Sequence, residues 1–401
     1  MTVVRSPHAV DGGVTQLPPP VEPSWADLGF APWAEPLYRF LQPALSLLGL
    51  YLIVRLGLIV TTVFAAHLTY GGHLDGPLTA WDGHWYLSVA ANWYPSAQAS
   101  GHATFAAGGF GPVFPALIWV LERLHLTGVE AALLVSFVGG AASVLVVWRL
   151  GTHMFDERAG WIGAVLFMLF PGMGISWGVF YCECVGLGLA AGCLLLMLRQ
   201  RWVWAGVVGA LATGTSPMGL ALAAAAIVPV VMCFVRGEKP KPLFTLLMIP
   251  VGFVAYVGYL GWHNHDALYW WHLQHQAWSA SVDFGKSLVM LLVHPWQGGY
   301  QGKGWMNWVG LIAVAAAIWT LIKAKPPLLT VVYCGAVFVV LFVSNSLGFK
   351  PRLLTWAFPA LIAVGSLTRR RGWQPIAIAF AYLMPVVFLA YTTYANYMIQ
   401  P

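Results

Sequence analysis

Residues 45–66 have the sequence LSLLGLYLIVRLGLIVTTVFAA, and the stretch Trp81-Asp82-Gly83-His84-Trp85-Tyr86 follows a short way beyond them. The first stretch carries one charged residue, Arg55, and has the length of about 20 apolar residues that a membrane-spanning helix needs. A carboxylate is costly in hydrocarbon, so we expect Asp82 at a membrane face or in a polar cavity. The surrounding aromatic side chains suit an interfacial segment, so this stretch alone is compatible with an aromatic belt as well as with a functional site.

The composition of the whole chain indicates the same class of protein. Hydrophobic residues make up 59% of the 401 residues and charged residues 8%, and the mean hydropathy is +0.73, whereas soluble proteins carry roughly 25% charged residues. The apolar runs are continuous rather than alternating, which excludes an outer-membrane barrel. The composition therefore predicts an all-α, polytopic membrane protein.

Eleven apolar stretches are predicted to span the bilayer. They cover residues 45–66, 131–149, 159–175, 183–198, 202–215, 218–235, 243–262, 305–322, 328–346, 353–367 and 374–395. The short loops rich in Lys and Arg all fall on the cytoplasmic side if the N-terminus is cytoplasmic, as the positive-inside rule requires. Their charge is thus a signal of topology and not of nucleic-acid binding.

This topology defines the predicted organisation of the chain. Residues 1–44 form a Pro-rich cytoplasmic tail, and residues 45–401 form one transmembrane domain. The outer loops comprise residues 67–130, with interfacial helices at Thr79–Ala91 and Pro112–Leu124, and residues 263–304. The compact loops and the absence of a eukaryotic retention signal favour a bacterial plasma membrane.

Polar residues elsewhere in the chain gather on the same predicted outer face. Glu183 begins an apolar span, where the helix dipole favours an acid, or it points into a cavity opposite Asp82. Lys350 and Arg352 lie where the topology predicts few cations, either as a snorkelling pair or as a clamp for phosphate. Ser216 lies in a segment that either forms a simple turn or lines a site.

Two further features of the sequence are compatible with either a functional or a structural role. The outer loop contains His275, Gln276 and Trp278 beside other imidazoles. Their spacing matches no closed metal site, so we assign no metal and expect contact with sugars or lipid head groups, or a position at the interface. Arg55 is expensive in lipid, so we expect it to face the bundle interior, either paired or near the outer cavity. The outer face could together hold a lipid-linked anion with its phosphate on Lys350 and Arg352 and its head group near Asp82.

Six short motifs, in order along the chain, resemble those of the PIG-V-like mannosyltransferases, relatives of GPI mannosyltransferase II. The resembling stretches are Trp81–Leu87, Phe114–Leu117, Phe180–Glu183, Leu211–Gly219, His265–Trp278, and Lys350–Arg352 with Phe358-Pro359. The chain departs from the family pattern at the turn around Ser216, where the family's usual Arg is absent, and after the Gln276–Trp278 motif, where an expected basic residue is missing.

The resemblance implies a GT-C bundle with an extracytoplasmic active site and a polyprenyl-phosphate-mannose donor. It implies that Asp82 is the catalytic base of a single, inverting displacement, which needs a carboxylate near the acceptor hydroxyl and cations at the departing phosphate. Lys350 and Arg352 would bind that phosphate. The remaining candidate substrate-binding residues are His84, Trp85, Glu183, Ser216, His275, Gln276, Trp278 and Arg55. No cofactor is implied, and the expected acceptor is a glycolipid or lipoglycan.

Other functions remain compatible with the same residues. A retaining glycosidase would need a second acid about 5–5.5 Å from the first, and Glu183 could be that acid. A transporter or flippase would bind the same lipid-linked sugar without forming a glycosidic bond. A non-catalytic member of the family would tolerate Ala at Asp82 and Glu183, whereas a transferase would lose turnover.

Overall fold

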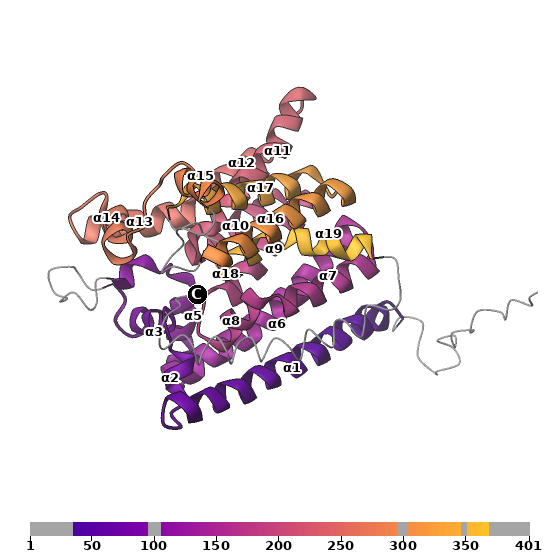
Figure 1. The fold of residues 1–401 in the computed structure, drawn as a ribbon. Helices are drawn as coiled ribbons and strands as arrows, with labels where there is room; N and C mark the ends of the chain where they lie inside the picture. Colours follow the sequence, from indigo (N-terminus) through magenta and orange to yellow (C-terminus); the bar gives the residue numbers. More distant parts are fainter. Residues whose placement is uncertain (1–34, 95–105, 295–303, 346–350, 369–401) are drawn as a thin grey trace, which may run out of the picture. The chain divides into compact units, whose positions relative to one another are not determined.

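The computed structural model describes residues 35–94, 106–294, 304–345 and 351–368 (Figure 1). Residues 1–45 and 46–401 form separate units, and only the beginning of helix α1 is described in the first. The predicted tail therefore lies mostly outside the described residues, as do the predicted span 374–395 and the candidate phosphate ligand Lys350.

The described residues are almost entirely helical, as the composition predicts. The first helices of the chain are α1 (Glu35–Thr69), α2 (Asp75–Leu78), α3 (Gly83–Asn92), η2 (Ala106–Gly109), α5 (Val113–Glu122) and α6 (Gly128–Met154). The central helices are α7 (Glu157–Leu169), α8 (Pro171–Gly178), α9 (Glu183–Leu198), α10 (Trp202–Thr215), η3 (Pro217–Leu220), α11 (Ala221–Val235), α12 (Leu243–Met248) and α13 (Val251–His263). The last are α14 (Tyr269–Trp278), α15 (Lys286–Val293), α16 (Gly304–Ala324), α17 (Leu328–Val343), α18 (Pro351–Leu354), η5 (Thr355–Ala357) and α19 (Pro359–Leu367). In this part of the chain, β pairing is confined to one isolated bridge between Val282 and Ser344.

Helix length divides the predicted spans into two groups. Four helical stretches are long and apolar enough to cross a membrane: Leu41–Leu68, Gly128–Met154, Pro217–Val235 and Leu243–His263. A fifth span results if α7 and α8, which meet at 57°, are counted together. The predicted spans 183–198, 202–215, 305–322 and 328–346 correspond to shorter apolar helices. The prediction of one span over 353–367 is wrong, because this stretch is divided into α18, η5 and α19, with Pro359 at the start of α19. The chain is thus a multi-pass membrane protein with several short or broken helices.

Proline explains where the broken helices break. Pro171 cannot continue the hydrogen bonding of α7, and the preceding Phe170 takes the extended conformation that a following proline favours. Pro250 lies between α12 and α13, but Ile249 before it stays in the helical conformation, and Leu243–His263 remains one span. Pro359 begins α19 after η5. The break before α8 matters most for function, because it places a short buried helix beside the candidate site.

The core of the bundle is the packing of α6 against α7 and α9. Glycines permit the closest approach, since a Cβ on Gly151 of α6 would lie 2.6 Å from Cα of Gly160 in α7. Helix α10 packs on α9, α19 on α7, and α11 on α17. Glycines at this contact therefore let the backbones of α6 and α7 approach closely.

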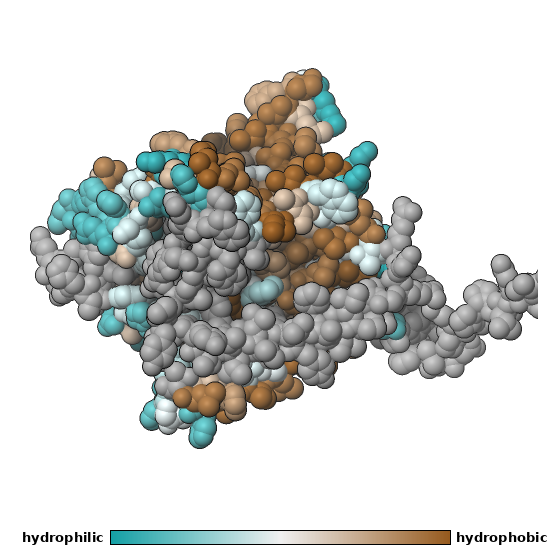
Figure 2. All heavy atoms as spheres, viewed as in Figure 1, coloured by the Kyte–Doolittle hydropathy of each residue, from teal (hydrophilic) through white to brown (hydrophobic). Residues whose placement is uncertain are grey.

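The surface of the bundle is suited to lipid. Exposed apolar side chains cover one face of α1, including Leu52, Leu56 and Val60, and continue on α11 and α12. Figure 2 shows this apolar surface over α11 and α12, and polar surface over the end that carries α13 and α14. Continuous exposed apolar area of this kind indicates contact with acyl chains rather than with water.

The segment that contains α3 and α5 forms a small helical layer at that polar end. Helix α3 packs on α5 and α6, and η2 lies against α14 (Figure 1). Buried aromatic and aliphatic side chains of α3 and the residues after it, of η2, and of α13 and α14 form one cluster, comprising Val89, Tyr94, Ala107, Tyr256, Leu260, Tyr269 and Leu273. Both predicted interfacial stretches thus form helices, α3 and α5, whose position at the interface stays a prediction.

Candidate active site

Asp82 lies at the N-cap position of α3, but its side chain caps no backbone amide. An N-cap aspartate ordinarily accepts a hydrogen bond from the first turn of its helix. The preceding Trp81 has a φ of 50°, a left-handed conformation that is unfavourable for a bulky residue. The carboxylate of Asp82 is therefore available for another partner.

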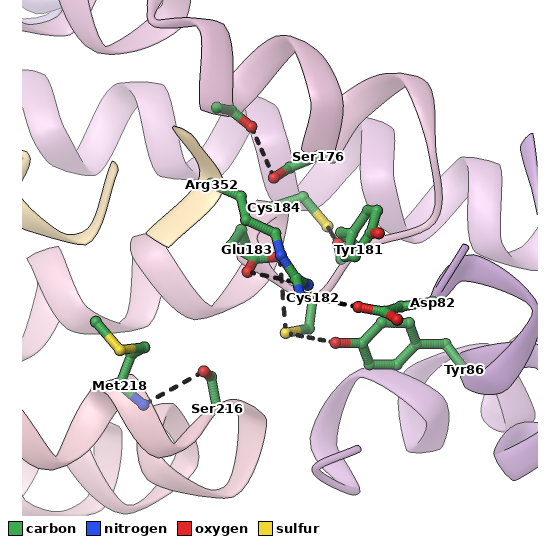
Figure 3. A network of polar contacts seen from close by, with 11 residues as sticks. Asp82, Tyr86, Ser176, Tyr181, Cys182, Glu183, Cys184, Ser216, Met218 and Arg352 are labelled. Atoms are coloured by element: carbon green, nitrogen blue, oxygen red, sulfur yellow. Dashed lines mark hydrogen bonds and ion pairs between the residues drawn. The ribbon is translucent and has the colours of Figure 1, made fainter. Parts of the chain in front are cut away.

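That partner is Arg352, at the beginning of α18. Its Nη2 lies 2.9 Å from Oδ2 of Asp82, and its Nη1 lies 4.0 Å from Oε1 of Glu183 (Figure 3). The three side chains come from α18, the N-terminus of α3 and the first residue of α9. The structure thus brings together three of the residues that the sequence singled out, and it places the cation between the two acids.

Tyr181 supports the guanidinium from its flat side. Cζ of Arg352 lies 4.6 Å from the centre of the Tyr181 ring, which is fully buried. A guanidinium stacks favourably on an aromatic face, more so in a site from which water is excluded. Burial opposes the charge of Arg352, but Asp82, Tyr181 and Glu183 outweigh it and raise the pKa of the guanidinium, which stays charged.

A second polar chain reaches Glu183 from α3. The hydroxyl of Tyr86 donates to Sγ of Cys182 at 3.0 Å, and that thiol lies 3.9 Å from Oε2 of Glu183 (Figure 3). Burial raises the pKa of both Tyr86 and Cys182, so both are protonated donors. Glu183 itself is 2% exposed, and these donors supply part of what the buried carboxylate loses by leaving water.

The segment between α8 and α9 is positioned by the segment before α3. The amide of Phe180 donates to the carbonyl of Leu78 at 3.1 Å. A Cβ on Gly83 would lie 2.9 Å from Cγ1 of Val179 and 3.0 Å from the carbonyl oxygen of Leu78. A side chain at position 83 would therefore force α3, which follows Asp82, or its neighbours to shift.

The rings of Trp85, Phe110 and Trp278 pack on one another between α3 and α14, and we call this group the aromatic wall. The rings of Trp85 and Phe110 are stacked with centroids 6.4 Å apart, and Trp278 meets Phe110 edge-on at 5.7 Å. Trp85 and Trp278 are half-buried, whereas His84, whose ring lies 4.4 Å from that of Trp85, is exposed. These residues could present a flat apolar face to a sugar.

Arg55 does not join this site. It is 4% exposed, and its Nη1 donates to the carbonyl of Trp177 at 2.9 Å and to Oγ of Ser136 at 3.3 Å. Aromatic rings of Tyr51, Phe137 and Trp177 surround it at 5.5–6.0 Å. Within the described residues Arg55 has no carboxylate partner. It faces the bundle interior, as expected, and ties α1 to α6 and to the end of α8.

The other candidates lie apart from the ionic cluster. Ser216 accepts a hydrogen bond from the amide of Met218 and begins η3, and Figure 3 shows this pair separate from Asp82 and Arg352. His275 and Gln276 are exposed on α14. No group of three His, Cys, Asp or Glu side chains that could hold a metal occurs in the described ranges. A substrate role for these residues stays a prediction.

The arrangement has the elements that transfer of a group from phosphate requires. A carboxylate, a cation that can bind a phosphate oxygen and a half-buried aromatic surface lie at one end of a bundle with an apolar exterior. Sequence reasoning missed Tyr181, Cys182 and Tyr86 as parts of this site. Two of them lie within the stretch Phe180–Glu183 that carries the family resemblance, and Tyr86 is four residues after Asp82, on the same face of α3.

Comparison with solved structures agrees with the GT-C prediction. The crystal structure of ArnT from Cupriavidus metallidurans bound to undecaprenyl phosphate matches with a TM-score of 0.51 and 17% identity, covering 79% of this chain and 59% of ArnT. The apo oligosaccharyltransferase of Archaeoglobus fulgidus matches with a TM-score of 0.43 and 14% identity, covering 86% and 56%. The same organism's AglB with an inhibitory peptide and a dolichol-phosphate gives 0.44 and 13%, again covering 86% and 56%.

The ArnT match, at a TM-score of 0.51, supports the fold and no more. The chain has the fold of GT-C membrane glycosyltransferases, and it spans 59% and 56% of the lengths of the ArnT and A. fulgidus chains. No protein-family model and no curated protein matches the sequence. Membership of the PIG-V-like family, which the six motifs suggest, stays a prediction.

Proposed function

We propose that this protein is a membrane mannosyltransferase that moves mannose from polyprenyl-phosphate-mannose to an extracytoplasmic acceptor, a glycolipid or lipoglycan. The observation that carries the proposal is the 2.9 Å pair of Asp82 and Arg352 within a GT-C bundle. A carboxylate beside an arginine supplies both a proton acceptor and a phosphate ligand in one place. The choice of mannose rests on the resemblance of the six motifs to PIG-V-like enzymes.

The lipid-phosphate donor has independent support from the fold comparison. The ArnT structure is bound to undecaprenyl phosphate, a lipid carrier of the class we propose for this chain. The apolar exterior of α1, α11 and α12 would accommodate the polyprenyl tail of such a donor in the bilayer. Lys350, two residues before Arg352 in the sequence, would add a second cation at the phosphate.

The proposed reaction is a single displacement at the anomeric carbon. Asp82 takes the proton of the acceptor hydroxyl as the acceptor oxygen forms its bond to C1 of the mannose. The bond between C1 and the phosphate oxygen breaks at the same time, and its electron pair leaves with the polyprenyl phosphate. Arg352 stabilises the charge that develops there, and the configuration at C1 is inverted. Glu183, through its contact with Arg352, would orient the cation, and Trp85 and Trp278 would contact the sugar or the acceptor.

The topology follows from the basic loops. We place the N-terminus and the loop Arg236–Lys241 in the cytoplasm, and Asp82, α14 and α15 on the outer face of a bacterial plasma membrane. The donor and the acceptor would then meet outside the cell, where no nucleotide sugar is available. The proposal therefore requires no nucleotide-binding domain and no cofactor beyond the lipid-linked donor.

The decisive experiment is a transfer assay with purified full-length protein in lipid. Radiolabelled polyprenyl-phosphate-mannose and a bacterial membrane-lipid extract are incubated with wild type, Asp82→Asn and Asp75→Asn. Asp75 is an exposed acid of the same loop, so its variant is the matched control. We expect label in a new glycolipid with wild type and Asp75→Asn, and a rate lower by about 10²–10⁴-fold with Asp82→Asn.

The other outcomes separate the competing functions. Equal transfer by Asp82→Asn and wild type would keep the transferase but remove Asp82 as its base. Movement of the labelled donor across vesicles by both proteins, without any new glycolipid, would identify a transporter instead. Neither donor binding nor transfer in any protein would favour a non-catalytic role.

A further inference from the structure

The guanidinium of Arg352 is held on two different surfaces. Its flat face lies on the ring of Tyr181, with Cζ 4.6 Å from the ring centre. Its edge points at the two acids, with Nη2 2.9 Å from Asp82 and Nη1 4.0 Å from Glu183. The two kinds of contact use different parts of the group, because stacking needs the π face and ion pairing needs the N–H donors.

One N–H donor of Arg352 lacks a hydrogen-bond partner. Its Nε is buried and has no hydrogen-bond partner within the described residues, and the contact with Glu183, at 4.0 Å, is long for a hydrogen bond. Buried donors are nearly always satisfied in folded proteins. This donor therefore indicates that a further oxygen ligand belongs beside the guanidinium. A phosphate group presents the same bidentate oxygens as a carboxylate and fits the same edge.

We infer that Asp82 and the phosphate of the lipid-linked donor bind the edge of Arg352 in turn, and that Tyr181 is the positioning residue that keeps the guanidinium in place during this exchange. The inference rests on the proposed function and deepens it. Because the ring of Tyr181 carries no charge and lies against Cζ of Arg352, it does not compete with either anion for the N–H donors. Glu183, nearly fully buried, remains beside the cation throughout.

The exchange would couple donor binding to activation of the base. While Asp82 is paired with Arg352 at 2.9 Å, its Oδ2 is occupied by the guanidinium and does not face an acceptor hydroxyl. When the donor phosphate takes the edge of Arg352, Asp82 is released toward the acceptor hydroxyl. Donor binding would therefore precede productive binding of the acceptor, and the unpaired base would be present only when a sugar is ready for transfer.

Competition between Asp82 and phosphate gives the first test, which needs no turnover. Radiolabelled farnesyl phosphate, a short lipid phosphate, is bound to full-length protein in phosphatidylcholine nanodiscs, with farnesol as competitor to reveal binding of the lipid tail alone. Asp82→Asn keeps the shape but removes the competing charge, so we expect affinity to rise by about tenfold. Asp75→Asn should leave the affinity unchanged. Unchanged or weaker binding by Asp82→Asn overturns the exchange.

The role of Tyr181 has its own variants. Tyr181→Phe keeps the ring, and we expect affinity for farnesyl phosphate within about twofold of wild type; Tyr181→Leu loses the ring and should bind about tenfold more weakly. Tyr333→Leu is the matched control. Tyr333, on α17, is as buried as Tyr181, and among the described residues α17 contributes to no ion pair. Equal affinity of the Phe and Leu variants of Tyr181 would overturn its positioning role, as would an equal loss in Tyr333→Leu. If Tyr181→Leu does not fold, Tyr181→Met replaces it.

Arg352→Gln separates this inference from the proposed function. We expect Arg352→Gln to abolish the part of farnesyl phosphate binding that farnesol cannot displace. If farnesyl phosphate binds equally well without Arg352, the phosphate site of the proposed function fails together with the exchange. If binding requires Arg352 but Asp82→Asn does not strengthen it, the phosphate site stands and only the exchange is overturned.

Discussion

At the scale of single residues, the site depends on two acids that lie at helix N-termini but bind an arginine from another helix. Asp82 stands at an N-cap position without capping α3, and Glu183 stands in the first turn of α9, where the helix dipole alone could account for it. Both instead contact Arg352. Because one cation serves two acids in a site of low exposure, the free energy of unfolding should depend strongly on Arg352.

Arg352→Gln tests this dependence. The substitution leaves Asp82 and Glu183 close together without a counter-charge, so we expect a loss of about 3 kcal/mol or more in stability, measured as a lower thermal unfolding midpoint in nanodiscs. The triple variant Arg352→Gln, Asp82→Asn and Glu183→Gln should recover most of it, because no charge is left unpaired. Arg123→Gln, an exposed arginine stacked on Trp119, is the control. A triple variant as unstable as the single one would contradict the argument.

The thiol of Cys182 gives a chemical prediction. Burial raises its pKa, and the hydroxyl of Tyr86 donates to its sulfur, so little reactive thiolate forms at pH 8. Iodoacetamide should therefore modify Cys182 in folded protein at less than about a tenth of its rate in unfolded protein. Peptide mapping by mass spectrometry measures the modification of Cys182 in both samples. Comparable labelling of Cys182 in folded and unfolded protein would show that this thiol is accessible and ionised.

At the scale of elements, the site is assembled where three short segments meet. The segment Val179–Cys182 lies between the N-terminus of α3 and the start of α9, and α18 packs on α8. The proline break before α8 produces this geometry, because it turns the chain within the bundle instead of letting α7 run on. Close approach of α3 to Val179 then sets the distance between Asp82 and Arg352.

Gly83→Ala tests that approach. The new Cβ would lie 2.9 Å from Cγ1 of Val179 and 3.0 Å from the carbonyl oxygen of Leu78, so α3 must shift, and a displacement of about 1 Å at a catalytic group can cost on the order of 100-fold in rate. Gly335→Ala, in α17 with no atom within 4 Å of the new Cβ, should leave transfer unchanged. Wild-type activity in Gly83→Ala would show that this contact does not position Asp82.

The start of α14 is held by a pair that responds to pH. Nδ1 of His272 lies 2.7 Å from Oδ2 of Asp266, and this hydrogen bond lowers the pKa of Asp266. A lowered pKa means that the pair stabilises the segment above the ordinary carboxyl range, near pH 4, and that this contribution is lost as the pH falls through the folded value. Amides of residues 267–272 should thus exchange faster in Asp266→Asn than in wild type at pH 6. The difference should shrink as the pH falls below the ordinary carboxyl range, and a difference that does not shrink there would contradict the assignment.

At the scale of the whole molecule, the exterior is organised for a bilayer. The apolar surface of α11 and α12 ends at the exposed basic loop Arg236–Lys241 (Figure 2). The positive-inside rule predicts that this loop lies in the cytoplasm, and the orientation that we propose therefore has α14 outside. Both the donor and the acceptor of the proposed reaction depend on that orientation.

Labelling of introduced cysteines in intact cells tests the orientation. In a variant without the five native cysteines, His275→Cys should react with a membrane-impermeant maleimide, and Lys239→Cys should react only after the membrane is permeabilised. Both positions are exposed, so the readout depends on the side of the membrane. The reverse pattern would place the candidate site in the cytoplasm and would overturn the proposed donor and acceptor topology.

The sequence by itself determined the class of protein and most of its helices. The predicted spans 183–198 and 202–215 coincide with α9 and α10, and the two stretches predicted as interfacial helices are helical, as α3 and α5. These predictions succeed because apolar length, helix-breaking prolines and charge are local properties of the chain. The same local reading also selected Asp82, Glu183 and Arg352 as unusual charges.

Only the tertiary structure decided what these residues do to one another. It placed Arg352 between two acids from other helices, put Tyr181 against its face, and separated Arg55 and Ser216 from the cluster. No local pattern contains this information, because residues far apart in the chain meet only when packed helices bring them together. Their contact depends on glycines that let α3 and the segment before α9 approach, on a proline break, and on a buried cation that needs more than one partner.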